Sequence, residues 1–493
     1  MERRCEITRG PACDDKIDKI EKKTYRMISF FPKQIASKAI ALYIASLAIV
    51  SILFVNYAMG LEYLLLGLMW VVGFFLLSSY CSVQWRSVPE KMLVRRVFLT
   101  ALALRWVWVF FSSYFYQSKT GQPFEFSAAD SIWYYEESIG YRKSSISALW
   151  DYLFAHSETV SDSGYLFYLS LLTKIVGDSI ILPRLVNSIF SAWTCVLIYQ
   201  LTKRIAGEEA GRLAGIFSCF MPNLIFYCGL HLKETMMLFL LVAFLERADY
   251  LLRIRKYTVW TIIVPFLLLV SLFTFRTVLG AAAAFAFVTG LVFTSTSVVG
   301  RKKRLMIIAW GALAVVTLAG GVIVNEVQGV WEDRETNQEA KRAYQTSKGN
   351  QWAKYATGTV MAPMMFVLPF PTMVDVDEQY NQQMLSGGNY VRNFFGGFVL
   401  LALFSAFFLK KNWRDLSFIG SFAIAYLGIM SATGFANSER FLLPGLPVLL
   451  ILAAYGVTLL DAKNYRFLRI WFWIVPVMIV GWAVFKLGSR GLL

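Results

Sequence analysis

The sequence has few histidines, few cysteines and few charged residues. Two histidines, His156 and His231, occur in 493 residues, which argues against a zinc centre because such sites draw on several histidine or cysteine ligands. Charged residues make up 16% of the chain, against about 25% in soluble domains. The six cysteines lie in the N-terminal tail or in and beside apolar runs, so no structural disulfide is expected. No phosphate-binding glycine motif of an ATP- or dinucleotide-binding fold occurs.

Long apolar runs are what the sequence has in abundance, since 57% of its residues are hydrophobic. Runs of roughly 20 residues are the length that a membrane core of about 30 Å requires. The sequence therefore predicts an all-α polytopic membrane protein with about thirteen transmembrane helices. The predicted spans are 36–57, 61–81, 96–116, 180–202, 209–229, 232–252, 258–275, 278–298, 304–324, 393–410, 416–434, 440–460 and 468–488.

The positive charge is distributed unevenly between the two sides of these spans. The net charge is +16, and most Lys and Arg residues lie in the N-terminal segment and in the loops of one side, such as TKRIAGEEAGR and RKKR. This asymmetry is typical of cytoplasmic loops. The basic balance therefore indicates topology and contact with membrane lipids rather than nucleic-acid binding. The N-terminus, MERRCEITRG, lacks the apolar core of a cleaved signal peptide, so we expect the first span to be retained.

Two long polar segments interrupt the spans on the extracytoplasmic side. The second of them contains MAPMMFVLPFPTMVD, whose prolines exclude a regular helix, so we predict a re-entrant or lipid-facing segment there. The expected organisation is a cytoplasmic N-terminal segment (1–35), three spans (36–116), an outer catalytic loop (117–179), a transmembrane core (180–324), a second outer loop (325–392) and the C-terminal spans (393–493).

The first outer loop carries a dense group of carboxylates in EFSAADSIWYYEESIGYRKSS. Asp130 precedes three aromatic residues that could stack on a sugar, and a carboxylate here could take the proton from an acceptor hydroxyl. Tyr134, Glu136 and Glu137 are candidate substrate contacts. Glu125 and Asp130 are candidate ligands for a divalent metal, Mg or Mn. The competing interpretation is that these acids are simply solvated loop residues.

Ionisable residues also gather at the outer ends of several predicted spans. Arginine and lysine at such positions suit the phosphate of a lipid, and adjacent acids could orient them. The alternative is that they cap helices or anchor them at the interface. The candidates for substrate binding are Arg184, His231, Lys233, Glu234, Arg276, Glu439 and Arg440; of these, Arg184 is expected to fix the outer loop through a carboxylate. Arg105, inside the span 96–116, either pairs internally or extends toward the cytoplasm.

Three stretches together resemble the GT-C superfamily of polyprenyl-phosphate-dependent membrane glycosyltransferases, particularly bacterial relatives of protein O-mannosyltransferases and aminoarabinose transferases. They are the loop around Asp130, residues 183–235 (PRLVNSIFSAWTC to LHLKET) and residues 438–456 (SERFLLPGLPVLLILAAYG). The resemblance implies a GT-C-like bundle in a bacterial inner membrane and an inverting transfer from a polyprenyl-phosphate sugar to a glycan, lipid or protein acceptor. It implies that Asp130 is the base and that Lys233, Arg276 and Arg440 contact the phosphate.

The sequence departs from that family in two respects. The loop follows the third predicted span rather than the first, and Ser131 replaces the acid that usually follows the catalytic aspartate, which leaves metal dependence open. One alternative is an O-antigen-type polymerase or ligase that uses a polyprenyl-diphosphate glycan and depends on Arg334, Arg342 and Arg392. Another is a transporter of lipid-linked sugars, which predicts mid-membrane charges and an inverted repeat. The gathering of charges at the outer face favours an enzyme.

Overall fold

The chain is helical throughout the part that the computed structural model describes. This part comprises residues 29–155, 161–254, 258–294, 370–376, 379–409, 413–433, 439–461, 463–488 and 490–492. Its one isolated antiparallel bridge pairs Ala58 with Val374. The predicted span 304–324 and most of the second predicted outer loop, including Arg334 and Arg342, lie outside the described residues.

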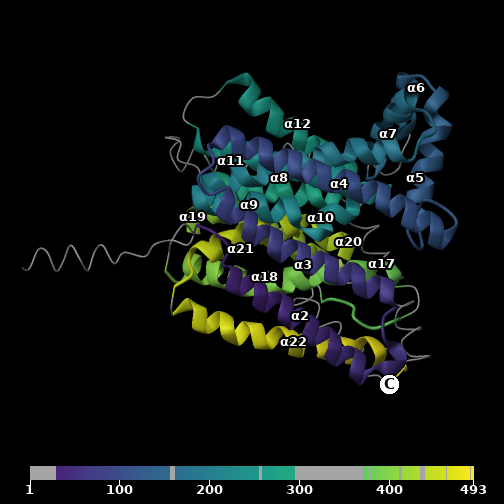
Figure 1. Ribbon diagram of the computed structural model, residues 1–493. Coiled ribbons are helices and arrows are strands. Elements are labelled where there is room, and N and C mark those ends of the chain that lie inside the picture. The colour runs from purple at the N-terminus through teal and green to yellow at the C-terminus, as the bar shows by residue number, and fades with distance from the viewer. Residues whose placement is uncertain are drawn as a thin grey trace, which may run out of the picture.

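Seven of the described helices are long and apolar enough to cross a membrane. The described chain is therefore that of a helical membrane protein, while the full count of thirteen spans stays a prediction. Helices α11 (Glu234–Arg253), α12 (Val259–Phe275) and α19 (Trp413–Thr433) lie alongside them in the bundle (Figure 1). The seven are α2 (Lys33–Leu53), α3 (Leu61–Gln84), α4 (Glu90–Thr120), α8 (Ile181–Ala206), α18 (Ser386–Phe407), Glu439–Thr458, and α22 (Asn464–Gly488).

Two predicted spans are broken by proline rather than continuous. Proline has no backbone N–H to continue a helix, and it is favoured in the first turn of a new one. Helix α9 therefore ends just before Pro222, and Pro222 is the first residue of the next helix. Pro444 lies at the second break. The span predicted at 209–229 becomes α9 (Glu208–Phe220), α10 (Pro222–Phe226) and the 3₁₀ turn Tyr227–Gly229, and the span predicted at 440–460 becomes α20 (Glu439–Leu442), the 3₁₀ turn Leu443–Gly445 and α21 (Leu446–Thr458).

One glycine makes a turn between two helices, and another allows two helices to pack closely. Gly207 joins α8 to α9 with a φ of 95°, a conformation that glycine adopts without steric cost. At Gly456 in α21, an added Cβ would lie 2.0 Å from the carbonyl oxygen of Phe398 in α18. Helix α8 packs on α4, α9 and α11, while α18 packs on α3, α21 and α22. The contact between α9 and α21 joins these two groups.

The segment between α4 and α8 folds into short helices at one end of the bundle. These are α5 (Ala129–Gly140), α6 (Ile146–Trp150), a π-helical turn (Asp151–Ala155) and α7 (Ser163–Val176). Figure 1 shows them beyond the ends of the long helices, at the end where α17 (Tyr380–Met384) and α20 also lie. We call this the α5 end.

The opposite end of the bundle holds those of the predicted cytoplasmic connections that the structure describes. There Arg204 pairs with Glu246 and Asp249, and Arg253 pairs with Asp249 and Asp415. The predicted outer and cytoplasmic connections thus lie at opposite ends of the described bundle. Which end faces the cytoplasm remains a prediction from the charge asymmetry.

Arg105 in α4 is bonded inside the protein. Its side chain is fully buried, and its Nε donates to Ser191 Oγ at 2.7 Å. Its two other nitrogens reach the carbonyl oxygens of Ala101, Ser218 and Cys219 at 3.1 to 3.3 Å. Of the two alternatives for Arg105, the structure therefore supports internal pairing, although its partners here are a hydroxyl, carbonyl groups and the Cys195 sulfur.

Candidate functional site

Asp130 owes its position to the first turn of α5. The turn is held by Ser131, whose hydroxyl donates to Glu125 Oε1 at 2.5 Å, with both side chains buried. A carboxylate in the first turn of a helix is stabilised by the exposed N–H groups there. Asp130 itself is exposed, with 57% of its side chain accessible. It is therefore fixed by its backbone and open to solvent at its carboxylate.

Arg184 fastens the segment before α5 to the long helices. Its side chain is fully buried; Nη1 donates to Ser113 Oγ at 3.1 Å and Nη2 to the carbonyl oxygen of Pro123 at 2.7 Å. The guanidinium also lies over the ring of Phe124. Arg184 thus holds the loop through a carbonyl oxygen rather than the expected carboxylate. Its Nε has no hydrogen-bond partner among the described residues, so its expected role as a substrate contact stays a prediction.

Six charged side chains meet at the α5 end, and we call them the ion cluster. Arg440 is at its centre: Nη1 contacts Asp130 Oδ2, and Nε contacts Glu234 Oε1. Arg276 Nη2 lies 3.7 Å from the same Glu234 oxygen. Lys233 contacts Asp162 and donates to the carbonyl oxygen of Phe275 at 3.2 Å. The ion cluster consists of Asp130, Asp162, Lys233, Glu234, Arg276 and Arg440.

The ion cluster runs from the protein interior to the surface. The side chain of Glu234 is 0% exposed and that of Arg276 is 9% exposed, whereas Arg440 is 22% and Asp130 57% exposed. Buried charges are costly unless they are paired, and here three cations face three carboxylates. Arg440 thus connects a buried, fixed carboxylate to a solvent-exposed one.

Arg276 lies at the junction of α12 and α13 (Thr277–Phe293), where the backbone is extended. Its guanidinium lies 4.5 Å from the centre of the Phe441 ring, and Nη1 donates to the Tyr426 hydroxyl at 3.5 Å. Tyr426 in turn donates to the carbonyl oxygen of Phe441 at 2.9 Å. These contacts hold Arg276 in one orientation beside Glu234, as a preorganised anion site requires.

Glu439 points away from the ion cluster although it neighbours Arg440 in sequence. Its Oε1 accepts a hydrogen bond from Asn389 Nδ2, and Asn389 Oδ1 accepts one from Asn223 Nδ2 at 3.2 Å. Arg392 lies one turn along α18 from Asn389. Glu439 therefore belongs to a separate buried polar group, which the sequence analysis did not anticipate.

Tyr134 and His231 are buried and pack against aromatic rings of the loop. Tyr134 is buried and packs edge-on against Tyr165, and burial raises the pKa of its hydroxyl. His231 is buried between the rings of Phe124 and Tyr135. Burial, with Arg184 as a smaller contribution, lowers the pKa of His231 to about 3, so this imidazole is neutral at pH 7. Both side chains pack within the loop, and their expected role as substrate contacts stays a prediction.

The other loop acids stand apart from the ion cluster. Glu136 is exposed on α5, and Glu137 faces Tyr141. Glu125 is buried, and desolvation raises the pKa of its carboxyl group despite the hydrogen bond from Ser131. Within the described residues, no group of three or more His, Cys, Asp or Glu side chains could hold a metal ion. The expected pair of Glu125 and Asp130 therefore lacks a third such ligand there.

Sequence reasoning missed Asp162, Asn223 and Asn389. Asp162 adopts a φ of 74° just before α7, and its sequence signal, SDSG before an apolar run, indicates a turn and says nothing of Lys233. The two asparagines precede or begin apolar helices and give no sign that they meet. Comparisons of this chain with protein-family models, with curated proteins and with solved structures find no match.

Proposed function

We propose that this protein is a membrane glycosyltransferase that moves a sugar from a polyprenyl-phosphate donor to an acceptor hydroxyl at the α5 end, on the extracytoplasmic face. The observation that supports this most directly is the contact between Asp130 and Arg440. It places an exposed carboxylate beside a guanidinium that is itself fixed by buried Glu234. Base and phosphate-binding cation are thus neighbours, as transfer from a glycosyl phosphate requires.

In this proposal the residues act in a defined order. The donor phosphate competes with Asp130 for Arg440, which frees the carboxylate to accept the proton of the acceptor hydroxyl. The hydroxyl oxygen bonds to the anomeric carbon while the bond from that carbon to the phosphate oxygen breaks. Arg440, Arg276 and Lys233 then stabilise the charge on the departing lipid phosphate. Glu234 keeps the two arginines in place.

The test is transfer by purified protein in vesicles with defined polyprenyl-phosphate sugars. Asp130→Asn should lower the transfer rate by about 10²- to 10⁴-fold, the usual contribution of a general base. Donor binding should persist, because the three cations remain. Glu62→Gln, which changes an exposed acid of α3, is the control and should keep nearly full activity. Full activity of Asp130→Asn would refute the assignment.

A polymerase or ligase that uses a polyprenyl-diphosphate glycan remains the second candidate. The observation in its favour is buried Arg392, whose Nε and Nη1 atoms have no hydrogen-bond partner among the residues that the structure describes. This function predicts that neutralising Arg392 abolishes activity while Asp130→Asn preserves it. Assays of both variants with monophosphate and diphosphate donors separate the two candidates.

A further inference from the structure

Helix α17 joins the segment that carries Asp130 to the rest of the bundle. Asn381, the second residue of this helix, donates from Nδ2 to the carbonyl oxygen of Phe126 at 2.7 Å. The ring centre of the preceding residue, Tyr380, lies 5.0 Å from that of Phe126. Phe126 is thereby fixed through both its backbone and its side chain, shortly before Asp130 in the sequence.

The conformation of Ser127 is the reason why this segment needs such contacts. Ser127 has a φ of 54°, in the left-handed region that is uncommon for residues other than glycine. A conformation of this kind persists only where the surrounding structure holds it. Two side chains hold the backbone just before it: Arg184 at the carbonyl oxygen of Pro123 and Asn381 at that of Phe126. The first turn of α5 follows directly and takes its direction from this turn.

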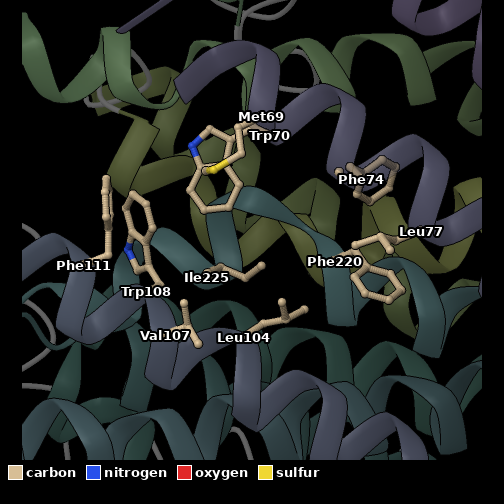
Figure 2. Close-up of a pocket in the computed structure, with 11 residues that line it drawn as sticks. Met69, Trp70, Phe74, Leu77, Leu104, Val107, Trp108, Phe111, Phe220 and Ile225 are labelled. Atoms are coloured by element: carbon tan, nitrogen blue, oxygen red, sulfur yellow. The ribbon is translucent and has the colours of Figure 1, made fainter. Parts of the chain in front are cut away.

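Helix α17 is itself held by long helices on two sides. Lys486 of α22 is buried, and its Nζ donates to Gln382 Oε1 at 2.6 Å. Trp70 of α3 donates from Nε1 to the carbonyl oxygen of Met384 at 3.2 Å. Figure 2 shows the indole of Trp70 in an apolar groove between α3 and α4, where it packs against Trp108. Helix α17 is therefore a fixed support for the segment before α5.

The same stretch of chain also reaches the residue beside Arg440. A single residue separates α17 from α18, which carries Asn389 in its first turn. Nδ2 of Asn389 donates to Glu439 Oε1, and Arg440 follows Glu439 in α20. The stretch 381–389 thus contacts the backbone just before Asp130 at one end and the neighbour of Arg440 at the other.

This support matters most when the donor binds. In the proposed function the donor phosphate takes Arg440 from Asp130, so the carboxylate gives up its ion pair when it must face the acceptor hydroxyl. Its place then depends on the backbone of α5. Taking the proposed function as given, we propose that Asn381 is a positioning residue for Asp130 and that Asn389 is one for Arg440. Together they set the base and the phosphate-binding cation relative to each other.

Asn381→Leu tests the first role, because leucine favours helices and lacks the N–H donor. In vesicles that contain the full-length protein and a polyprenyl-phosphate sugar, kcat should fall by about ten- to hundredfold, since a displacement of about 1 Å can cost 10²-fold. The Kd for polyprenyl phosphate should stay as in the wild type. Gln117→Leu is the matched control: Gln117 Nε2 donates to the carbonyl oxygen of Gly121 at 2.8 Å, and its loss should leave kcat unchanged.

A double variant distinguishes positioning of Asp130 from a general loss of structure. Because Asn381 acts through the carboxylate, Asn381→Leu should have no further effect on kcat when it is added to Asp130→Asn, as for residues that act as a unit. A general structural defect would lower kcat by the same factor with and without Asp130. Equal factors in the two backgrounds, or an unchanged kcat in Asn381→Leu alone, would overturn the inference.

Asn389→Ala tests the second role. It should raise the Kd for polyprenyl phosphate by about tenfold, the lower range for a hydrogen bond to a charged group, and add nothing to the loss in Arg440→Gln. Asn389 is fully buried, so thermal unfolding first establishes that the variant folds. Asn223→Ala, which removes the donor to Asn389 Oδ1 at 3.2 Å, is the second variant and should raise the Kd in the same direction. Wild-type binding in either folded variant would overturn this role.

Hydrogen exchange separates failure of this inference from failure of the proposed function, because it requires no transfer. Loss of one hydrogen bond in Asn381→Leu should raise amide exchange in residues 126–132 by roughly two- to tenfold, whereas Gln117→Leu should not. If exchange rises there while Asp130→Asn transfers sugar normally, the support stands and the assignment of the base fails. If transfer depends on Asp130 while Asn381→Leu matches the wild type in exchange and kcat, the function stands and this inference fails.

Discussion

Glu234→Gln is the substitution that most directly tests the electrostatic account of the ion cluster. The side chain of Glu234 is 0% exposed, and one of its oxygens contacts Arg440 and lies 3.7 Å from Arg276. Glutamine preserves the shape of the side chain and removes its charge. The two arginines then face each other without the carboxylate that separates them, although Arg440 still has Asp130.

The expected loss of unfolding free energy in Glu234→Gln follows from the burial of this ion pair. Removing one partner of a buried ion pair costs about 3–5 kcal/mol, because the remaining charge is left uncompensated. Arg440 is 22% exposed and keeps a second carboxylate, while Arg276 is 9% exposed and keeps the Tyr426 hydroxyl and the Phe441 ring. We therefore expect the lower end of the range, about 3 kcal/mol. Reversible unfolding in detergent micelles, followed by circular dichroism, measures it.

The control is the same substitution in an exposed pair. Glu62 contacts Lys119 at 2.6 Å, with their side chains 43% and 39% exposed, so Glu62→Gln should cost at most about 1 kcal/mol. In the double variant Glu234→Gln/Arg440→Gln, the loss of unfolding free energy should be smaller than the sum of the losses in the two single variants. The difference should be about 0.5–3 kcal/mol, as expected for coupled charges. A loss below 1 kcal/mol in Glu234→Gln, or strict additivity in the double variant, would refute the reasoning.

Two further predictions concern packing and pH. Gly456→Ala should destabilise the fold by about 1–3 kcal/mol, because the new methyl group would lie 2.0 Å from the Phe398 carbonyl oxygen; Gly481→Ala, with open space around it, should be neutral or stabilising, and equal unfolding curves for the two variants would contradict this. Because burial raises the pKa of Glu125, this carboxyl group favours folding below its unfolded pKa and loses that contribution as the pH rises through its folded pKa. Glu125→Gln should therefore gain stability relative to the wild type with rising pH, and an unfolding difference that is independent of pH would exclude this.

The helical architecture follows from local sequence properties. Apolar runs and the basic connections between them predict the long helices and the two ends at which their connections gather, because both depend on nearby residues. The sequence also shows the two prolines, Pro222 and Pro444, at which the structure has breaks. Inside a strongly apolar run, however, the pattern alone does not say whether proline bends a helix or divides it, since neighbouring helices can satisfy the freed backbone groups.

The candidate site was predictable in its composition but not in its pairings. Lys233, Glu234, Arg276 and Arg440 were expected near Asp130 because each lies at the outer end of a predicted span. The role of Arg184 and the burial of His231 depend on how the loop before α5 folds back on α4, which no local pattern reveals. Likewise, nothing in the sequence separates Glu439 from its neighbour Arg440, although their side chains join different groups.

The burial of Arg105 bears on how this chain is assembled in the membrane. Its partners Ser191 and Ser218 belong to α8 and α9, which are synthesised after α4. Until they arrive, the guanidinium has only the Ala101 carbonyl oxygen of its own helix as a partner, at a cost of about 2.5–3.5 kcal/mol during insertion. Stable integration of α4 is therefore coupled to the arrival of α8 and α9, and a nascent chain truncated before residue 180 should leave α4 only loosely held in the bilayer.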